Sequence, residues 1–413
     1  MKRILIILAS LIVLIGIVVG AYFLLSSNQG GGLTINNPFD GLGGSATDVT
    51  VNSEGLEPGE LLQGAGTEVA PRFFKITQGP VVPQAVSFGI KIPIEEAVSE
   101  NTGSTTPEVV YRDDTEIRYI ERASGNVYSF VLHDRTLTRL GNRTLPGIQR
   151  AAWVADGTRA FVQYLNTDTA IDTVETYSLP ANGDGGYFLE EGLDQIDVLG
   201  STLVTLLSNA SGSVATTAEI DGSAPRTLFS TPLSSIQLHL SSGSYVAATK
   251  ASSALDGYAF LVSPTSGAFT RILGPLRGLS VLPSPTGTKI LYSYVSQGAV
   301  RMSLFDTATR SSIVLPLSTL SEKCAWSSDE AFIYCAIPSS FTGTLPDDWY
   351  QGAVSTSDRL WRIDLTARLA TLLIDPAEAA EVSIDAVGVT VDANSDSVTF
   401  TNRKDGSLWV YDL

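Results

Sequence analysis

The sequence predicts an all-β fold, a seven-bladed β-propeller, and the main evidence is a repeat of about 43 residues. Each repeat is marked by a short turn signal, and the run that follows the turn is rich in residues typical of β-strands. The turn signals stand at Asp114, Gly157, Gly200, Gly243, Gly287 and Glu330. A spacing of 40–45 residues with about four short strands per unit is characteristic of propeller blades. Two further features of the sequence are an uncharged N-terminal run and two cysteines that flank one of the turns.

The first segment, residues 1–25, is expected to be a transmembrane signal anchor. The run Ile4–Leu25 holds no charged residue, and a helix of that length can cross a bilayer core about 30 Å thick. Lys2 and Arg3 precede the run, so the positive-inside rule places the N-terminus in the cytoplasm and the rest of the chain outside, in a periplasm or at the cell surface. The alternative is a long signal peptide that is cleaved near Ser26.

Residues 26–70 are expected to be a disordered linker, because they are rich in glycine and their only charges are acidic. The whole chain has 43 acidic and 26 basic residues and a net charge of −17. Nucleic acids and anionic lipid surfaces bind clustered Lys and Arg, so this balance argues against both as partners. Residues 71–413 are then the propeller domain.

The last repeat unit predicts how the ring closes. It runs from Val387 to Leu413 and ends after three strands. The segment Arg72–Thr77 resembles the fourth strand of other units, so we expect it to pair with Leu408–Leu413 as the outer strand of the last blade. Such pairing joins the first and last blades and removes an open sheet edge. Six or eight blades remain alternatives, because the third and seventh units are weakly marked.

The two cysteines, Cys324 and Cys335, are expected to form a disulfide. A hairpin centred between Asp329 and Glu330 places them directly opposite each other. Cα atoms in such a pair are about 4.5 Å apart, within disulfide range, and the bond persists in an oxidising compartment. Two buried free thiols are the alternative. The pair alone, without further Cys or a nearby His, does not indicate a metal site.

Several units resemble the WD-repeat-like and TolB-like propeller families. The resemblance rests on turns and strand ends: Trp153-Val-Ala-Asp-Gly157, Ser284-Pro-Thr-Gly287, Trp326-Ser-Ser-Asp329, Phe305-Asp306, Ile363-Asp-Leu365 and Tyr411-Asp-Leu413. It covers roughly residues 72–413, although no unit carries the whole motif. The resemblance implies protein–protein recognition more than catalysis.

One loop departs from the repeat. Residues 338–358 of the sixth unit separate its second and third strands, where other units have shorter connections. Long loops on a rigid scaffold often carry function. This loop supplies the candidate partner-binding residues Phe341, Asp347, Asp348, Trp349 and Tyr350. The alternative is that Trp349 packs onto its own blade. A second extension, residues 375–382, is expected to form a short helix on the same face.

These observations favour a membrane-anchored, extracytoplasmic module that binds another protein or an envelope polymer, or serves as a scaffold, without catalysis. The sequence holds none of the common catalytic fingerprints, and neither a metal nor a cofactor is expected. Recurrent aspartates at the ends of third strands are expected to accept hydrogen bonds from turn amides. The alternative function is a hydrolase of envelope glycan or peptide that uses Asp347 and Asp348 at the mouth of the propeller channel.

Overall fold

The structure is a computed structural model that describes residues 71–94, 110–167 and 172–413. The predicted transmembrane anchor and the predicted linker therefore lie outside the described residues. Within the described ranges, no helix combines the length and the apolar character that a membrane span needs.

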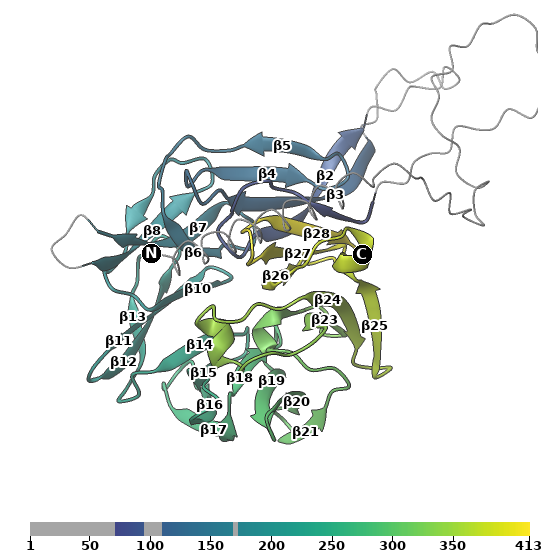
Figure 1. Ribbon diagram of the computed structural model, residues 1–413. Coiled ribbons are helices and arrows are strands. Elements are labelled where there is room, and N and C mark those ends of the chain that lie inside the picture. The colour runs from purple at the N-terminus through teal and green to yellow at the C-terminus, as the bar shows by residue number, and fades with distance from the viewer. Residues whose placement is uncertain (1–70, 95–109, 168–171) are drawn as a thin grey trace, which may run out of the picture. The chain divides into compact units, whose positions relative to one another are not determined.

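Seven four-stranded antiparallel sheets follow one another around a ring (Figure 1). The first blade contains β2 (Val86–Ile94), β3 (Val110–Ile120), β4 (Val127–Val131) and β5 (Thr136–Arg139). The second contains β6 (Ile148–Trp153), β7 (Arg159–Asn166), β8 (Thr173–Pro180) and β9 (Tyr187–Phe188). The third contains β10 (Gln195–Leu199), β11 (Thr202–Asn209), β12 (Gly212–Glu219) and β13 (Arg226–Thr231). The fourth contains β14 (Ile236–Leu240), β15 (Tyr245–Thr249), β16 (Asp256–Val262) and β17 (Phe269–Arg277).

The fifth blade contains β18 (Ser280–Pro283), β19 (Lys289–Ser296), β20 (Ala299–Asp306) and β21 (Ser311–Val314). The sixth contains β22 (Cys324–Trp326), β23 (Phe332–Pro338), β24 (Asp358–Asp364) and β25 (Leu369–Ile374). The seventh contains β26 (Ala386–Val391), β27 (Ser397–Asn402) and β28 (Leu408–Asp412), and its outer strand is β1 (Phe73–Lys75). The count of seven blades is thus confirmed.

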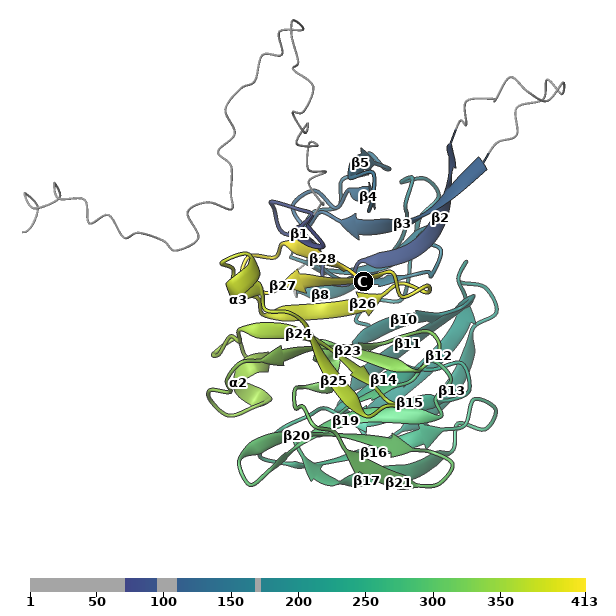
Figure 2. The ribbon, with the colours of Figure 1, turned by 90° about the vertical axis from the view of Figure 1, so that its right-hand side faces the viewer.

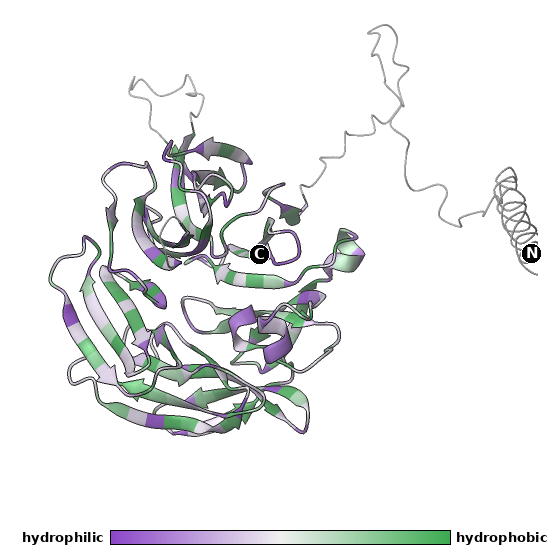
Figure 3. Cartoon of the chain, turned by 60° about the vertical axis from the view of Figure 1, so that its left-hand side comes forward, coloured by the Kyte–Doolittle hydropathy of each residue, from purple (hydrophilic) through white to green (hydrophobic). Residues whose placement is uncertain are grey.

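The hydrophobic core lies between neighbouring sheets, because each blade buries both of its faces against the next one. Between the fifth and sixth blades, for example, Leu291 and Met302 belong to the same cluster as Trp326 and Ile333. Polar and apolar positions alternate along many strands (Figure 3), as expected where successive side chains point to opposite faces. The short turns between strands carry the polar residues that recur with the repeat.

The predicted closure is confirmed. β1 pairs with β28 in antiparallel register, with Phe73 opposite Tyr411 and Lys75 opposite Trp409. The ring of Phe73 stacks on that of Trp409 with centroids 4.8 Å apart, and Phe73 is only 8% exposed. The N-terminal strand therefore completes the last blade and closes the ring.

The predicted disulfide is also confirmed. Cys324 and Cys335 are directly opposed on β22 and β23, and their sulfur atoms are bonded at 2.05 Å. Both residues are buried. A cross-link that closes a loop of this size stabilises a fold by roughly 2–3 kcal/mol in the chain-entropy treatment.

One of the turn assignments is wrong. Asp114 lies inside β3 and is 4% exposed, and no turn occurs there. The first two strands of this blade continue past that point, with Ile90 opposite Asp114 and Ile94 opposite Val110, so the connection between them falls within residues 95–109, outside the described residues. The Asp114 carboxylate instead accepts bonds from the backbone N–H groups of Thr115 and His133. A polar residue that serves this role inside a strand resembles a turn residue in sequence.

The aspartates at the ends of third strands mostly act as predicted. Asp221 accepts a hydrogen bond from the backbone N–H of Ser223, and Asp306 accepts one from Thr309. Asp364 accepts from Thr366 in the same way, at 2.9 Å. Asp134 differs, because its carboxylate pairs with Arg112.

The described residues include three short helical segments. They are η1 (Ser321–Lys323), α2 (Asp347–Tyr350) and α3 (Pro376–Ala379). Figure 2 shows α2 and α3 on the same side of the ring. Asp375 caps α3 by accepting a bond from the backbone N–H of Ala377 at 3.1 Å, and Pro376 occupies the first helical position. The predicted helical extension is therefore present on the predicted face.

Candidate functional site

The long connection between β23 and β24 holds α2 against three blades. Asp347 accepts a hydrogen bond from the backbone N–H of Ser253 in the fourth blade, at 2.7 Å. Arg403 of the seventh blade donates to the carbonyl of Trp349 at 2.5 Å and lies over its ring. Tyr350 donates to Glu322, just before the first strand of the sixth blade. The loop is thus held to the fourth, sixth and seventh blades.

Trp349 is the buried anchor of this loop. Its side chain is 5% exposed and clusters with Val300, Leu320 and Leu345. Its indole Nε1 donates to Asp385 Oδ1 at 3.0 Å. The alternative in the sequence analysis was that Trp349 packs onto its own blade; in the structure Trp349 is buried, but it also contacts Val300 of the fifth blade and Asp385 beside the seventh.

The other four candidate residues differ in how much surface they offer. Asp348 accepts a bond from the backbone N–H of Thr344 at 2.6 Å, and Asp347 is held as described above. Both carboxylates therefore position the backbone of their own loop or its neighbour. Phe341 is 43% exposed and Tyr350 is 38% exposed. A partner-binding role for this loop stays a prediction, in which Phe341 and Tyr350 offer the larger accessible areas.

A buried charge cluster lies beneath Trp349. The Lys323 ammonium is 1% exposed and pairs with Asp358 at 2.7 Å and with Asp385 at 2.6 Å. It also donates to the hydroxyl of Thr356 at 3.0 Å and lies 4.9 Å from the centroid of the Trp349 ring. A lysine that is almost fully buried requires such partners, because an unpaired charge in the interior is very costly.

The pKa values of the two carboxyl groups in the cluster shift in opposite directions. Burial alone would raise the pKa of Asp385, but the Lys323 ammonium and hydrogen bonds from Trp349 and Thr356 outweigh it and hold the pKa at about 2. Burial dominates at Asp358 and raises its pKa. Its Oδ1 atom is buried without a hydrogen-bond partner. Asp385 is thus the ionised partner that ties the loop, the lysine and the seventh blade together.

We expect replacement of Trp349 to destabilise the fold. Trp349→Ala should lower the free energy of unfolding by about 3–5 kcal/mol, the range for a lost core aromatic. Trp349→Phe keeps a ring but removes the bond to Asp385, at an expected cost of about 1–3 kcal/mol. Urea denaturation measures both, and Phe341→Ala is the exposed control, expected within about 0.5 kcal/mol of wild type. Equal losses for Phe341→Ala and Trp349→Ala would contradict this account of the loop.

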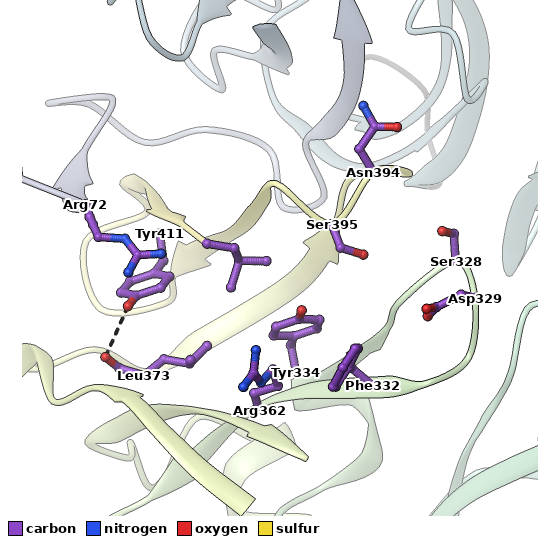
Figure 4. A pocket seen from close by; sticks show the side chains of 11 residues that line it. Arg72, Ser328, Asp329, Phe332, Tyr334, Arg362, Leu373, Asn394, Ser395 and Tyr411 are labelled. Carbon is purple, nitrogen blue, oxygen red and sulfur yellow. Dashed lines mark hydrogen bonds between the residues drawn. The ribbon is translucent and has the colours of Figure 1, made fainter. Parts of the chain in front are cut away.

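A second place, which the sequence analysis did not predict, is a cavity of about 580 Å³ between the sixth and seventh blades (Figure 4). It includes the turns between the first and second strands of both blades. The connection that carries α2 leaves β23 at its opposite end. Its lining comprises Arg72, Ser328, Asp329, Phe332, Tyr334, Arg362, Leu373, Asn394, Ser395, Tyr411 and Leu413. Two guanidinium groups and five aromatic or aliphatic side chains thus line one cavity.

Arg362 is the unusual group in this cavity. Its guanidinium lies over the ring of Phe332, 5.1 Å from the centroid. Its Nε atom is buried, and none of the residues that the structure describes makes a hydrogen bond or an ion pair to this side chain. A buried donor without a partner costs about 1–3 kcal/mol. The side chain is therefore equipped to bind something that the described chain does not supply.

Tyr334 stands beside Arg362. The two residues are directly opposed on β23 and β24, and Figure 4 shows their side chains next to each other in the cavity. Tyr334 is 3% exposed, and burial raises the pKa of its hydroxyl, which remains a donor at neutral pH. Within the described ranges, no protein group accepts a bond from this hydroxyl. The cavity thus contains two adjacent donors without acceptors.

Arg72 and Asp329, the other charged residues of the cavity, both have hydrogen-bond partners. Arg72 donates through Nε to the carbonyl of Asp412 at 2.8 Å and lies over the ring of Tyr411, which leaves its terminal nitrogens at the exposed rim. Asp329 accepts from Ser327 Oγ at 2.6 Å and from the backbone N–H of Ala331 at 3.0 Å. These bonds hold the pKa of Asp329 below its usual range, so it stays ionised.

A signal for this site is present in the sequence. Arg362 lies two residues before the aspartate that ends its strand, Asp364. The same position in the fifth and seventh blades holds Leu304 and Val410, and both are buried. An arginine in place of a buried aliphatic residue breaks the repeat, and this break is visible only when the blades are aligned position by position.

The inner strands of the propeller carry two titratable residues that the cavity does not include. Asp197 on β10 and His239 on β14 lie on neighbouring inner strands. Burial raises the pKa of Asp197 to about 6 and lowers that of His239 to about 4, so His239 is neutral at pH 7. His133, the other histidine, bonds to Asp114 through its ring Nδ1 at 2.8 Å. In the described residues, no group of three or more His, Cys, Asp or Glu side chains is arranged to hold a metal ion.

Comparison with known proteins shows the fold. No protein-family model matches the sequence, and no curated protein matches it. Among solved structures, an oligogalacturonate lyase from Vibrio parahaemolyticus has a TM-score of 0.51 at 10% identity, over 82% of this chain and 93% of that one. A β-propeller domain from Myceliophteria thermophila has a TM-score of 0.47 at 7% identity, over 72% and 93%. TolB from Acinetobacter baumannii has 0.43 at 9% identity, over 69% and 78%.

Proposed function

We propose that this chain is a membrane-anchored, outward-facing propeller that binds another molecule of the cell envelope without transforming it. The run Ile4–Leu25 serves as the anchor, and residues 26–70 serve as the tether. The disulfide between Cys324 and Cys335 supports an extracytoplasmic location, because such bonds persist in oxidising compartments. The net charge of −17 supports a soluble exported domain that binds neither nucleic acid nor an anionic lipid surface.

The observation that carries the binding role is the cavity between the sixth and seventh blades. Its donors Arg362 and Tyr334, whose side chains make no hydrogen bond to a described residue, lie among aromatic and aliphatic side chains. Ligand sites in proteins typically combine apolar walls with a few well-placed polar groups. Arginine and tyrosine also dominate the energetics of recognition sites. Among the described residues, neither group is bonded to a general base or a nucleophile, the pairing typical of nucleophilic catalysis.

The hydrolase alternative draws less support from the geometry. Its proposed carboxylates, Asp347 and Asp348, each accept a backbone hydrogen bond that fixes the loop. A general acid would need a raised pKa, whereas the pKa of Asp347 is lowered: bonds to Ser253 and Ser252 outweigh the opposing effect of burial. We therefore assign these two groups to loop positioning.

A site-specific photo-cross-linking experiment in intact cells tests the proposal. A photoreactive amino acid replaces Asn394 at the cavity, Phe341 on the α2 loop, or Ser266 on an outer turn of the fourth blade, all exposed positions. We expect a discrete cross-linked species from Asn394 and none from Ser266. A species from Phe341 as well would extend binding to the predicted loop face. Absence of any discrete species at both Asn394 and Phe341 would contradict a binding module.

A further inference from the structure

The guanidinium of Arg362 has one free edge that matters for its ligand. Its two Nη groups together form an end-on fork whose N–H bonds match the two oxygens of a carboxylate. Nε itself is buried, no described residue makes a hydrogen bond or ion pair to this guanidinium, and the side chain lines the cavity, so the fork is poorly solvated. A desolvated guanidinium edge binds a planar anion far better than it binds a neutral acceptor. The Tyr334 side chain lies beside Arg362, and its hydroxyl is the second donor that a bound anion could use.

The net charge of the whole molecule favours a ligand with a single negative charge. At −17 the chain repels polyanions at long range, and the repulsion acts against acidic polysaccharides and nucleic acids. A ligand that carries one negative charge and is otherwise neutral or basic is repelled much less. The ionised Asp329 on another side of the cavity also favours a ligand with a neutral or positive group away from its anion.

The rest of the cavity lining is suited to a short peptide. Phe332, Leu373 and Tyr411 offer apolar and aromatic surface, and Asn394 and Ser395 offer hydrogen-bonding groups at the edge. Arg72 lies at the rim with its terminal nitrogens free. Capture of a C-terminal carboxylate by fixed donors, with a pocket for the last side chain, is a recurring mode of peptide recognition.

We propose that this cavity binds the free C-terminal carboxylate of a partner protein, with Arg362 and Tyr334 as the carboxylate ligands. The inference rests on the proposed binding function and specifies its ligand. The last side chain of the partner lies against Phe332 and Tyr411, and the preceding residues leave past Arg72. The partner's tail carries few acidic residues.

The test uses the full chain in detergent, immobilised, and a pool of N-acetylated tetrapeptides of random sequence with free C-terminal carboxylates. Retained peptides are quantified by mass spectrometry. The same pool with amidated C-termini is the ligand control, and short oligogalacturonates are the polyanion control. The variants are Arg362→Gln, Arg362→Lys and Tyr334→Phe. Arg271→Gln removes the same charge from an exposed site on β17 and is the matched control.

We expect retention of the free-acid pool at least tenfold above that of the amidated pool. Arg362→Gln should reduce retention about tenfold, Tyr334→Phe several-fold, and Arg362→Lys by an intermediate amount, with Arg271→Gln unchanged. Circular dichroism and an intact disulfide verify that each variant is folded. Equal retention of both pools, or retention that Arg362→Gln leaves intact in a folded variant, would overturn the proposal.

Two further outcomes separate this inference from the binding function itself. Retention of oligogalacturonates in place of peptides would overturn the peptide assignment and leave an anion-binding module. Absence of retention for every pool, together with a discrete cross-link from Asn394, would overturn the C-terminal ligand and leave the binding function standing. Absence of both would overturn the two proposals together.

Discussion

Replacing Lys323 with methionine will lower the free energy of unfolding by about 3–5 kcal/mol, the range for removing one partner of a buried ion pair. The substitution keeps most of the side-chain volume but leaves the carboxylate of Asp385 buried without its counter-ion. Asp385 is 0% exposed and its partner is 2.6 Å away in the wild type. The variant must therefore protonate this group or admit water to it.

Urea denaturation at neutral pH measures the loss. The matched control is Lys289→Met, because Lys289 lies near Glu330 at 3.5 Å but its side chain is 34% exposed. We expect that control to cost at most about 1 kcal/mol. Comparable losses for the two variants would show that the buried cluster adds nothing specific to stability.

The same cluster sets a pH dependence. The pKa of Asp385 is about 2 in the folded chain, against an ordinary value of 3.8. A group whose pKa is depressed by folding stabilises the fold above its unfolded pKa and loses that contribution as the pH falls through the folded value. The contribution of Asp385 is therefore complete above about pH 4 and disappears toward pH 2. Lys323→Met should flatten the stability profile in that window.

Deleting residues 1–78 will cost the domain most of its stability, whereas deleting residues 1–70 will cost little. The longer deletion removes β1, whose residue Phe73 alone is worth about 3–5 kcal/mol as a buried aromatic. It also removes backbone bonds such as that from Ile76 N–H to the carbonyl of Leu408, at 2.8 Å. A domain whose total stability is about 5–15 kcal/mol is then close to unfolding.

Thermal melting and size-exclusion chromatography of the two truncations test this expectation. The shorter deletion should elute as a folded species. The longer one should melt far lower or aggregate through the exposed edge of β28. The point variant Phe73→Ala supplies an intermediate loss without changing the length of the chain. Melting temperatures that agree between the two truncations would contradict a closing role for β1.

The repeat was readable from the sequence because blades repeat their turns at fixed spacing. The pairing of Cys324 with Cys335 followed from the symmetry of a hairpin about its turn, and the closing strand followed from the missing outer strand of the last unit. The prediction of a turn at Asp114 was wrong because an aspartate that accepts backbone hydrogen bonds inside a strand looks, in the sequence, like an aspartate in a turn. Local patterns thus predicted the local geometry, and the error arose where one residue served two strands.

The candidate site was harder to predict because it depends on contacts between distant segments. Trp349 meets Asp385 and Lys323 only once the sixth and seventh blades are packed together. Arg362 and Arg72 come from opposite ends of the chain. Arg362, which stands where the fifth and seventh blades have buried aliphatic residues, was the available clue for the cavity. The position of Lys323 gave no such clue, because the second and fifth blades have Arg150 and Ser280 there. Lys323 and Arg362 each stand beside the seam between the last two blades.

That seam has a mechanical consequence. The chain ahead of residue 71 continues directly into β1, so any tension along it reaches the ring first at a strand of three residues, Phe73–Lys75. Arg72 lies both at the start of this strand and on the rim of the cavity. A ligand that contacts Arg72 and Arg362 together would fasten the strand to the sixth blade and raise the force needed to peel it away. Under the proposed function, ligand binding in the cavity would therefore change the tension that the tether can bear before β1 separates from the ring.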